Sequence, residues 1–237
     1  MQNIGSILKA GVRKYGHKEA VVFEEVRLTY TALDERVNRL AHGFASLGCT
    51  QGKTLAILSQ NSHKYLEVYL AAAKLGLIVV PLNFMFLDDE LIHAIDDSEA
   101  AICMVGEDYV KVAERIKPHL NHVARWIAMD DELPSFGNYE DLLREAPQHE
   151  AQAKIDQNAI AVLAYKRGDS NHPKGIMLSH RNILNSAHAL MGLLDLRSID
   201  VGCFVLPLYQ TEIVNAFCML MAGGKAVINR KVDTSEI

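Results

Sequence analysis

The stretch TLAILSQNSHKYLEVYLAAAKLGLIVVPLN, residues 54–83, contains one complete strand–helix–strand unit. Its two ends, TLAILS and LIVVPLN, are short apolar segments of the kind that form strands buried on both faces. Between them, apolar residues recur at the spacing of one helix face, at Tyr65, Val68, Tyr69, Ala72 and Leu75. Asn61 is expected to cap this helix and Gly76 to end it. The unit therefore predicts two parallel strands joined by a crossover helix.

The same alternation of strand-like and helix-like segments continues on both sides of this unit. Towards the N-terminus, AVVF and VRLTY predict a hairpin around residues 24–25, and a helix that Thr31 opens follows it. Towards the C-terminus, the pattern predicts a helix in 88–100, a strand in 100–105 and a helix that begins in 109–120. This alternation favours the α/β fold class, with a mostly parallel sheet flanked by helices on both faces.

The polar stretch 130–157 is predicted to be a connection with one short helix at 139–145. It divides the chain into two expected subdomains, 1–150 and 157–237. The elements expected after it are strands at 159–165, 175–180, 202–208 and 225–229, and helices at 180–194 and 213–221. A last helix start at 233–236 is too short to hold a face in place, so we expect the architecture to continue beyond it.

The composition is that of a globular protein, since 49% of the 237 residues are hydrophobic and 22% are charged. The formal net charge of −5 argues against nucleic acid or an anionic membrane as the main partner. Four cysteines without CxxC spacing predict buried thiols in a reducing compartment. No stretch reaches the roughly 20 apolar residues that a membrane span needs. A cytoplasmic protein without a membrane span is therefore expected.

The segment AYKRGDSNHPKGIMLSHRN, residues 164–182, is the strongest candidate for a ligand site. Backbone N–H groups in a glycine-containing turn can converge on phosphate oxygens, and a lysine adds positive charge. Gly168 and Lys174 have the spacing of a Walker loop, but Pro173 stands at the second glycine and Gly175 follows the lysine. A strand rather than a helix is predicted next, which excludes the Walker motif.

The strand–loop–strand context resembles the signature of the adenylate-forming (AMP-forming) acyl- and aryl-CoA synthetases. Their loop reads close to [ST]-[ST]-G-[ST]-T-G-x-P-K-G, and the loop here keeps the glycine and the P-K-G end. Other segments are similar to the family in order and spacing, namely LTYTALDERVNRLAHGFASLG, QNSHKYLEVYLAAAKLGLIVVPLN, DDELIHAIDDSEA and VLPLYQ…LMAGGKAVI. The resemblance covers nearly the whole chain.

Such enzymes activate a carboxylate with ATP as an acyl-adenylate, release pyrophosphate, and pass the acyl group to coenzyme A. The resemblance implies the N-terminal part of the large adenylation domain, with ATP and Mg as cofactors and a fatty or aromatic acid as substrate. It also implies that Gly168, Ser170, Lys174 and Gly175 are what remains of the phosphate loop. It assigns no catalytic residue and no metal ligand in this chain.

This sequence departs from the family pattern at the loop and beyond it. Lys166, Arg167 and Asp169 replace hydroxyl residues, and Asn171 replaces a glycine. Gln210 in PLYQ stands where the family usually has histidine, so it cannot carry a proton or a positive charge. The family is about twice as long, and its later adenine, ribose, hinge and catalytic-lysine motifs have no counterpart here. We therefore expect an N-terminal fragment with a degenerate phosphate loop, inactive or impaired by itself.

Two other interpretations remain open. The chain is alternatively a non-catalytic binding or regulatory protein that reuses the fold, with Lys166 and Arg167 serving another anion or a protein partner. The concentration of changes in residues 166–171 also fits an engineered or altered chain. Self-association is left open, because a sheet edge or apolar face without its neighbours can drive it.

Overall fold

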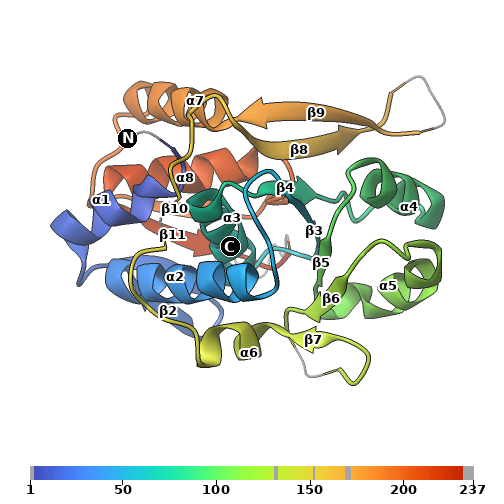
Figure 1. The fold of residues 1–237 in the computed structure, drawn as a ribbon. Helices are drawn as coiled ribbons and strands as arrows, with labels where there is room; N and C mark the ends of the chain where they lie inside the picture. Colours follow the sequence, from blue (N-terminus) through green and yellow to red (C-terminus); the bar gives the residue numbers. More distant parts are fainter. Residues whose placement is uncertain (1–2, 131–132, 152, 169–171, 232–237) are drawn as a thin grey trace.

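The computed structural model describes residues 3–130, 133–151, 153–168 and 172–231. A seven-stranded sheet and a four-stranded sheet are surrounded by helices (Figure 1). The larger sheet has the order β7-β6-β5-β3-β4-β8-β9, and the smaller has the order β10-β11-β1-β2. The strands of the larger sheet are β3 (Thr54–Leu58), β4 (Ile78–Pro81), β5 (Ile102–Val105), β6 (Arg125–Ala128), β7 (Gly137–Asn138), β8 (Ile160–Lys166) and β9 (Lys174–Ser179). Those of the smaller are β1 (Glu19–Phe23), β2 (Val26–Thr29), β10 (Val201–Phe204) and β11 (Lys225–Ile228).

The strand directions confirm the predicted α/β class with mostly parallel sheets. In the larger sheet all neighbouring strands are parallel except β8 and β9, which form an antiparallel hairpin. In the smaller sheet β1 and β2 form the antiparallel hairpin that the sequence predicted, and the other pairs are parallel. Each parallel connection needs a crossover, and the helices supply it.

The helices of the described residues are α1 (Ser6–Tyr15), α2 (Tyr30–Ser46), α3 (His63–Leu75), α4 (Asp88–Asp97), α5 (Val110–Ile116), α6 (Tyr139–Arg144), α7 (His180–Leu193) and α8 (Glu212–Ala222), with short 3-10 turns at Glu107–Tyr109 and Lys117–His119. Helices pack on both faces of the larger sheet, and α2 and α8 also contact strands of the smaller sheet. Along β3, Leu55 and Ile57 belong to the apolar cluster on the α3 side, whereas Ala56 and Leu58 belong to the cluster on the α4 side. Burial on both faces explains why β3 is continuously apolar.

Two predicted helix caps are corrected by the structure. The cap of α2 is Thr29, whose hydroxyl accepts a hydrogen bond from the Ala32 N–H at 3.1 Å, and Thr31 lies inside the helix. The cap of α3 is Ser62 rather than Asn61, since the Ser62 hydroxyl accepts from the Tyr65 N–H at 3.1 Å. Ser, Thr and Asn are all good caps, so residue type alone did not distinguish the capping residue from a similar residue close to it in the sequence.

Asn61 instead joins the two sheets. Its side-chain amide donates to the carbonyls of Leu206, at 2.9 Å, and Asn229, at 3.1 Å. Its side-chain oxygen accepts from the N–H of Leu208 at 2.8 Å. Asn61 is 3% exposed, so these three bonds satisfy a buried amide. The end of β3 is thereby fixed to the segments that follow β10 and β11.

The sheets also show what the sequence pattern did not predict. Residues 125–128 form β6, which lies in a stretch given no strand in the sequence analysis. Both sheets take strands from either side of residue 150, so the division into 1–150 and 157–237 stays a prediction about sequence segments.

The helix start expected at 233–236 lies outside the described residues. In the part of the chain that is described, no helix is both long and apolar enough to cross a membrane.

Candidate functional site

The candidate phosphate loop connects β8 to β9 at the edge of the larger sheet (Figure 1). The structure places Lys174 and Gly175 at the start of β9, and Gly168 just after β8. All three are exposed. Ser170, like the replaced positions Asp169 and Asn171, lies outside the described residues. Three of the four residues assigned to the loop can therefore be located.

Two lysines lie opposite each other at the loop end of this hairpin. Lys166 and Lys174 are cross-strand partners in the β8–β9 ladder. Neither ammonium group has a hydrogen bond or ion pair with any residue that the structure describes. Like charges directly opposite in a sheet are destabilising. An anion between them would remove that repulsion, which makes the pair a candidate anion site.

The two glycines of the loop, Gly168 and Gly175, differ in how much space surrounds them. A Cβ atom added at Gly168 would meet no atom within 4 Å, so the backbone there is open to an approaching ligand. A Cβ atom at Gly175 would lie 2.8 Å from Leu163 Cδ1 and 3.3 Å from the Tyr165 ring. Packing within the hairpin therefore accounts for Gly175 without a ligand, whereas nothing in the described surroundings of Gly168 requires a glycine.

The hairpin is fastened to α4 through three polar side chains of that helix. Glu90, His93 and Asp97 are three and four residues apart, which places them along one side of α4. The Tyr165 hydroxyl donates to Asp97 Oδ2 at 2.5 Å, and His93 Nε2 lies 3.2 Å from the Pro173 carbonyl oxygen. Burial, followed by the Asp97 carboxylate, raises the pKa of Tyr165, so its hydroxyl stays a donor.

Arg167 makes the strongest of these attachments. Its Nε and Nη2 each donate to one oxygen of Glu90, both at 2.6 Å, and Nη2 also donates to the Met85 carbonyl at 3.1 Å. The guanidinium lies over the Phe86 ring, 5.4 Å from its centre. The hydrogen bond from Arg167 is the main cause that lowers the pKa of Glu90. The residue that replaces a family hydroxyl is thus paired with a carboxylate.

A cavity of about 670 Å³ lies between the hairpin, α3 and α8. Its walls are mostly apolar, and among the described residues its only charged lining comes from Lys166 and Arg167. The apolar walls comprise Val162, Ala164, Ile176, Leu178, Ile183, Ile213 and Val214. Tyr209 and Gln210 of the PLYQ segment line the same space. The fold therefore brings both departures from the family pattern, at the loop and at Gln210, to one cavity.

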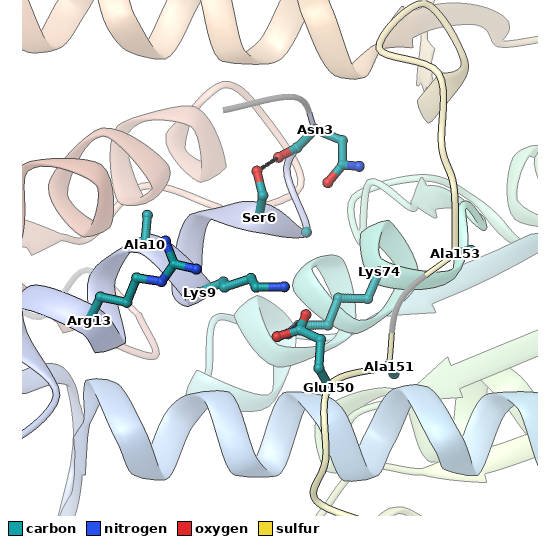
Figure 2. Close-up of a pocket in the computed structure, with 10 residues that line it drawn as sticks. Asn3, Ser6, Lys9, Ala10, Arg13, Lys74, Glu150, Ala151 and Ala153 are labelled. Carbon is teal, nitrogen blue, oxygen red and sulfur yellow. Dashed lines mark hydrogen bonds and ion pairs between the residues drawn. The ribbon is translucent and has the colours of Figure 1, made fainter.

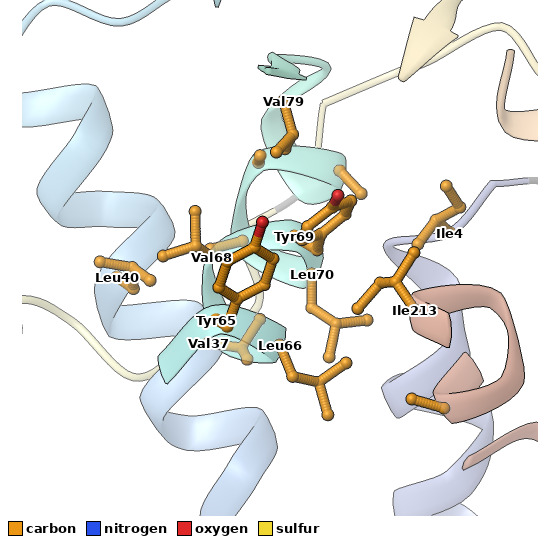
Figure 3. Close-up of a cluster of buried hydrophobic side chains, with 14 of the residues drawn as sticks. Ile4, Val37, Leu40, Tyr65, Leu66, Val68, Tyr69, Leu70, Val79 and Ile213 are labelled. Carbon is orange, nitrogen blue, oxygen red and sulfur yellow. The ribbon is translucent and has the colours of Figure 1, made fainter. Parts of the chain in front are cut away.

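Tyr69 is a lining residue that sequence reasoning treated only as part of an apolar helix face. It is 2% exposed, and its hydroxyl has no hydrogen-bond partner among the described residues. Its ring stacks on Tyr65 at 5.7 Å between centroids, inside the apolar cluster of α2, α3 and α8 (Figure 3). In the sequence, Tyr69 lies on the apolar face of a predicted helix, and that pattern predicts a buried side chain. The pattern does not show whether the buried hydroxyl finds a hydrogen-bond partner.

Replacing Tyr69 with phenylalanine is expected to raise the free energy of unfolding by about 1 kcal/mol, because it removes a buried hydroxyl that has no partner. Tyr30→Phe is the matched control. The Tyr30 hydroxyl donates to the carbonyls of Gly224, at 2.8 Å, and Leu220, at 3.2 Å, so its loss should destabilise by about 1 kcal/mol. Urea unfolding of both variants checks the signs, and equal losses would contradict the unpaired state of Tyr69.

A second, smaller cavity of about 280 Å³ lies between α1, the end of α3 and residues Glu150, Ala151 and Ala153 (Figure 2). The buried ammonium group that lines this cavity, that of Lys74, is already paired with carboxylates. Lys74 Nζ lies 3.0 Å from Asp34 Oδ1 and 2.8 Å from Glu150 Oε1, and the lysine side chain is 1% exposed. A cation that holds two carboxylates is accounted for by the fold. The larger cavity is therefore the better candidate for a ligand.

Comparison with known proteins shows which family and which relatives this chain is similar to. The family model described as AMP-binding enzyme matches residues 8–236. An acyl-CoA ligase, sidI, from Aspergillus fumigatus is 26% identical over 226 residues, covering 87% of this chain and 38% of that protein. A feruloyl-CoA synthase from an Amycolatopsis species is 28% identical over 241 residues, covering 100% of this chain and 46% of that protein. The chain spans less than half the length of these curated relatives.

Solved structures show the same fold. The inhibitor-bound N-terminal domain of FACL13 from Mycobacterium tuberculosis superposes with a TM-score of 0.92 at 25% sequence identity. The match covers 100% of this chain and 59% of that one. The fold described above is therefore that of the N-terminal domain of acyl-CoA ligases.

Proposed function

Because the chain belongs to the family of AMP-binding enzymes, we propose that it is the N-terminal part of an AMP-forming ligase that joins a carboxylic acid to coenzyme A. The observation that carries this proposal is the cavity at the hairpin. It combines apolar walls with a cationic rim at Lys166, Arg167 and the neighbouring Lys174. Such a space suits an acid whose body is apolar and whose reacting end meets phosphate.

In this proposal Lys174 binds a phosphate oxygen of MgATP, and the open backbone at Gly168 lies against the same phosphates. Ser170 and Gly175 complete the loop. ATP, when bound, supplies the AMP group that activates the carboxylate. Coenzyme A is the co-substrate, and the cytoplasm is the proposed location.

The apolar surface favours a fatty or aromatic acid as substrate. An adjoining hollow of about 520 Å³ runs along α7 and shares Leu178, Ile183 and Val214 with the main cavity. No acidic side chain is among the lining residues described for either space. An acid with a long or flat apolar body can bury its surface there at roughly 25 cal/mol per Å².

Calorimetric titration with MgATP tests the site. We compare the native chain with a variant that restores the family's loop, Lys166→Thr, Arg167→Ser, Asp169→Thr and Asn171→Gly. The restored loop is expected to bind MgATP about tenfold more tightly, which corresponds to roughly 1.4 kcal/mol. The variant loses the positive charges of Lys166 and Arg167, which lowers the affinity for phosphate. It also loses the Asp169 carboxylate, whose charge repels phosphate, and it regains hydroxyl donors, and we expect these two gains to be the larger effect.

Two lysine variants in the restored background make the result specific. Lys174→Ala should abolish the gain, whereas Lys111→Ala, an exposed lysine on α5, should leave it unchanged. A restored loop that still binds no MgATP would contradict a phosphate site in this chain. Equal effects of the two lysine changes would contradict the role of Lys174.

A non-catalytic binding protein is the second candidate, and the contact between Arg167 and Glu90 favours it. A residue that has replaced a family hydroxyl now fastens the loop to α4. The same titration separates the two candidates. Binding by the restored loop but not by the native chain would show a disabled site on an intact scaffold. Binding by both would favour the ligase.

A further inference from the structure

We propose that Glu90 is a positioning residue that weakens phosphate binding at the hairpin by holding the Arg167 guanidinium on α4. The inference rests on the proposed function only in taking the anion at the Lys166–Lys174 pair to be a polyphosphate. It concerns a contact of Arg167, which stands where the loop pattern given in the sequence analysis has a hydroxyl residue.

The contacts of Arg167 with the described residues use three of the five N–H donors of its guanidinium and leave the two of Nη1. Its Nε and Nη2 are both committed to Glu90, in the two-pronged geometry that is strongest for a guanidinium and a carboxylate. A third bond goes to the Met85 carbonyl. Arg167 nevertheless lines the main cavity, next in sequence to Lys166. A phosphate in that cavity would have to compete with Glu90 for the paired Nε and Nη2 donors, the side of the guanidinium that gives a two-pronged contact here.

The two members of this ion pair differ in how firmly they are held. The Glu90 side chain is 14% exposed and that of Arg167 is 53% exposed. Glu90 Oε2 also accepts a hydrogen bond from the Leu87 N–H at 2.7 Å, which caps the start of α4. The carboxylate is therefore fixed by its own helix, and the guanidinium is the partner that can move. Two-pronged phosphate binding through Nε and Nη2 of Arg167 must first break a contact that the free protein already makes.

Glu90→Gln isolates the charge of this contact. Glutamine keeps an oxygen that can accept from the Leu87 N–H, so the cap of α4 is retained. It lacks the negative charge that holds the guanidinium. Asp88→Asn is the matched control, since it removes one carboxylate from the same first turn of α4. Asp88 binds Arg115 of α5, at 2.8 and 2.9 Å, and has no hydrogen bond or ion pair with the described residues of the hairpin.

The test is calorimetric titration with sodium tripolyphosphate at low ionic strength. Glu90→Gln is expected to tighten binding about fivefold, the size of a partly exposed charge-assisted contact. Asp88→Asn, with the same change in net charge, should change binding less than twofold, through screened long-range attraction alone. Arg167→Ser supplies a second background. In that background Glu90→Gln should have no effect, because the carboxylate acts through the arginine.

Three results would overturn the inference. Equal tightening by Glu90→Gln and Asp88→Asn would assign the effect to overall charge, and a persistent gain in the Arg167→Ser background would exclude the arginine as the route. The third is a Glu90→Gln variant that binds no better than the native chain. If the native chain binds tripolyphosphate but Glu90→Gln changes nothing, only this inference fails. If no variant binds it, including the restored loop, the proposed phosphate site fails as well.

Discussion

Replacing Glu67 with alanine is expected to lower the free energy of unfolding by about 3–5 kcal/mol. The carboxylate lies on α3 and its side chain is 0% exposed. It accepts a hydrogen bond from Arg36 Nε of α2 at 2.7 Å and another from the Tyr139 hydroxyl of α6 at 2.6 Å. One buried carboxylate therefore links three helices. Its removal leaves the buried Tyr139 hydroxyl and part of the Arg36 guanidinium without their acceptor, which is costly in a low-dielectric interior.

Glu140→Ala provides the control for this network. Glu140 binds the same arginine, with Arg36 Nη2 at 2.9 Å from its Oε1, but its side chain is 43% exposed. Water can replace that contact, so we expect a loss of about 1 kcal/mol or less. Urea unfolding of both variants measures the difference. If Glu67→Ala costs no more than Glu140→Ala, burial of the carboxylate does not set its contribution.

Gly223→Ala is expected to destabilise the fold by about 3 kcal/mol. Gly223 ends α8 with a φ of 80°, a left-handed conformation that costs an L-residue roughly 1–2 kcal/mol. A Cβ atom there would also overlap the Tyr15 ring of α1. Forcing extra volume into a packed contact adds about 1–3 kcal/mol. The Tyr15 ring belongs to α1, and Gly223 ends α8. Moving the ring away would therefore disturb the packing of α1 against α8.

Gly48→Ala separates the two causes of this effect. Gly48 follows α2 with a φ of 82°, almost the same backbone conformation, but an added Cβ atom would meet nothing within 4 Å. Only the conformational cost, about 1–2 kcal/mol, is expected there. Thermal and urea unfolding of the two variants measure the difference, which is the contribution of the Tyr15 contact. Equal losses would mean that the ring relaxes without cost.

The sequence by itself determined the elements that rest on local pattern. Continuous apolar strands such as 54–58 and the helix stripe from Tyr65 to Leu75 follow from periodicity, and the structure confirms them. The loop signature with Lys174 and Gly175 also follows from residue order, as does the family that the resemblance named. Local hydrogen bonding and side-chain spacing are properties of neighbouring residues, so they can be read along the chain.

Only the tertiary structure decided which side chains meet. Asn61 and Ser62 are equally good caps by type, and the choice between them was made by carbonyls more than 140 residues away along the chain. Arg167 could have faced a phosphate, but α4 places Glu90 beside it across 77 residues. Tyr69 could have been ordinary core, but its hydroxyl lies next to the cavity without a hydrogen-bond partner among the residues that the structure describes. Contacts between distant segments depend on how helices and sheets pack, and no local pattern encodes that arrangement.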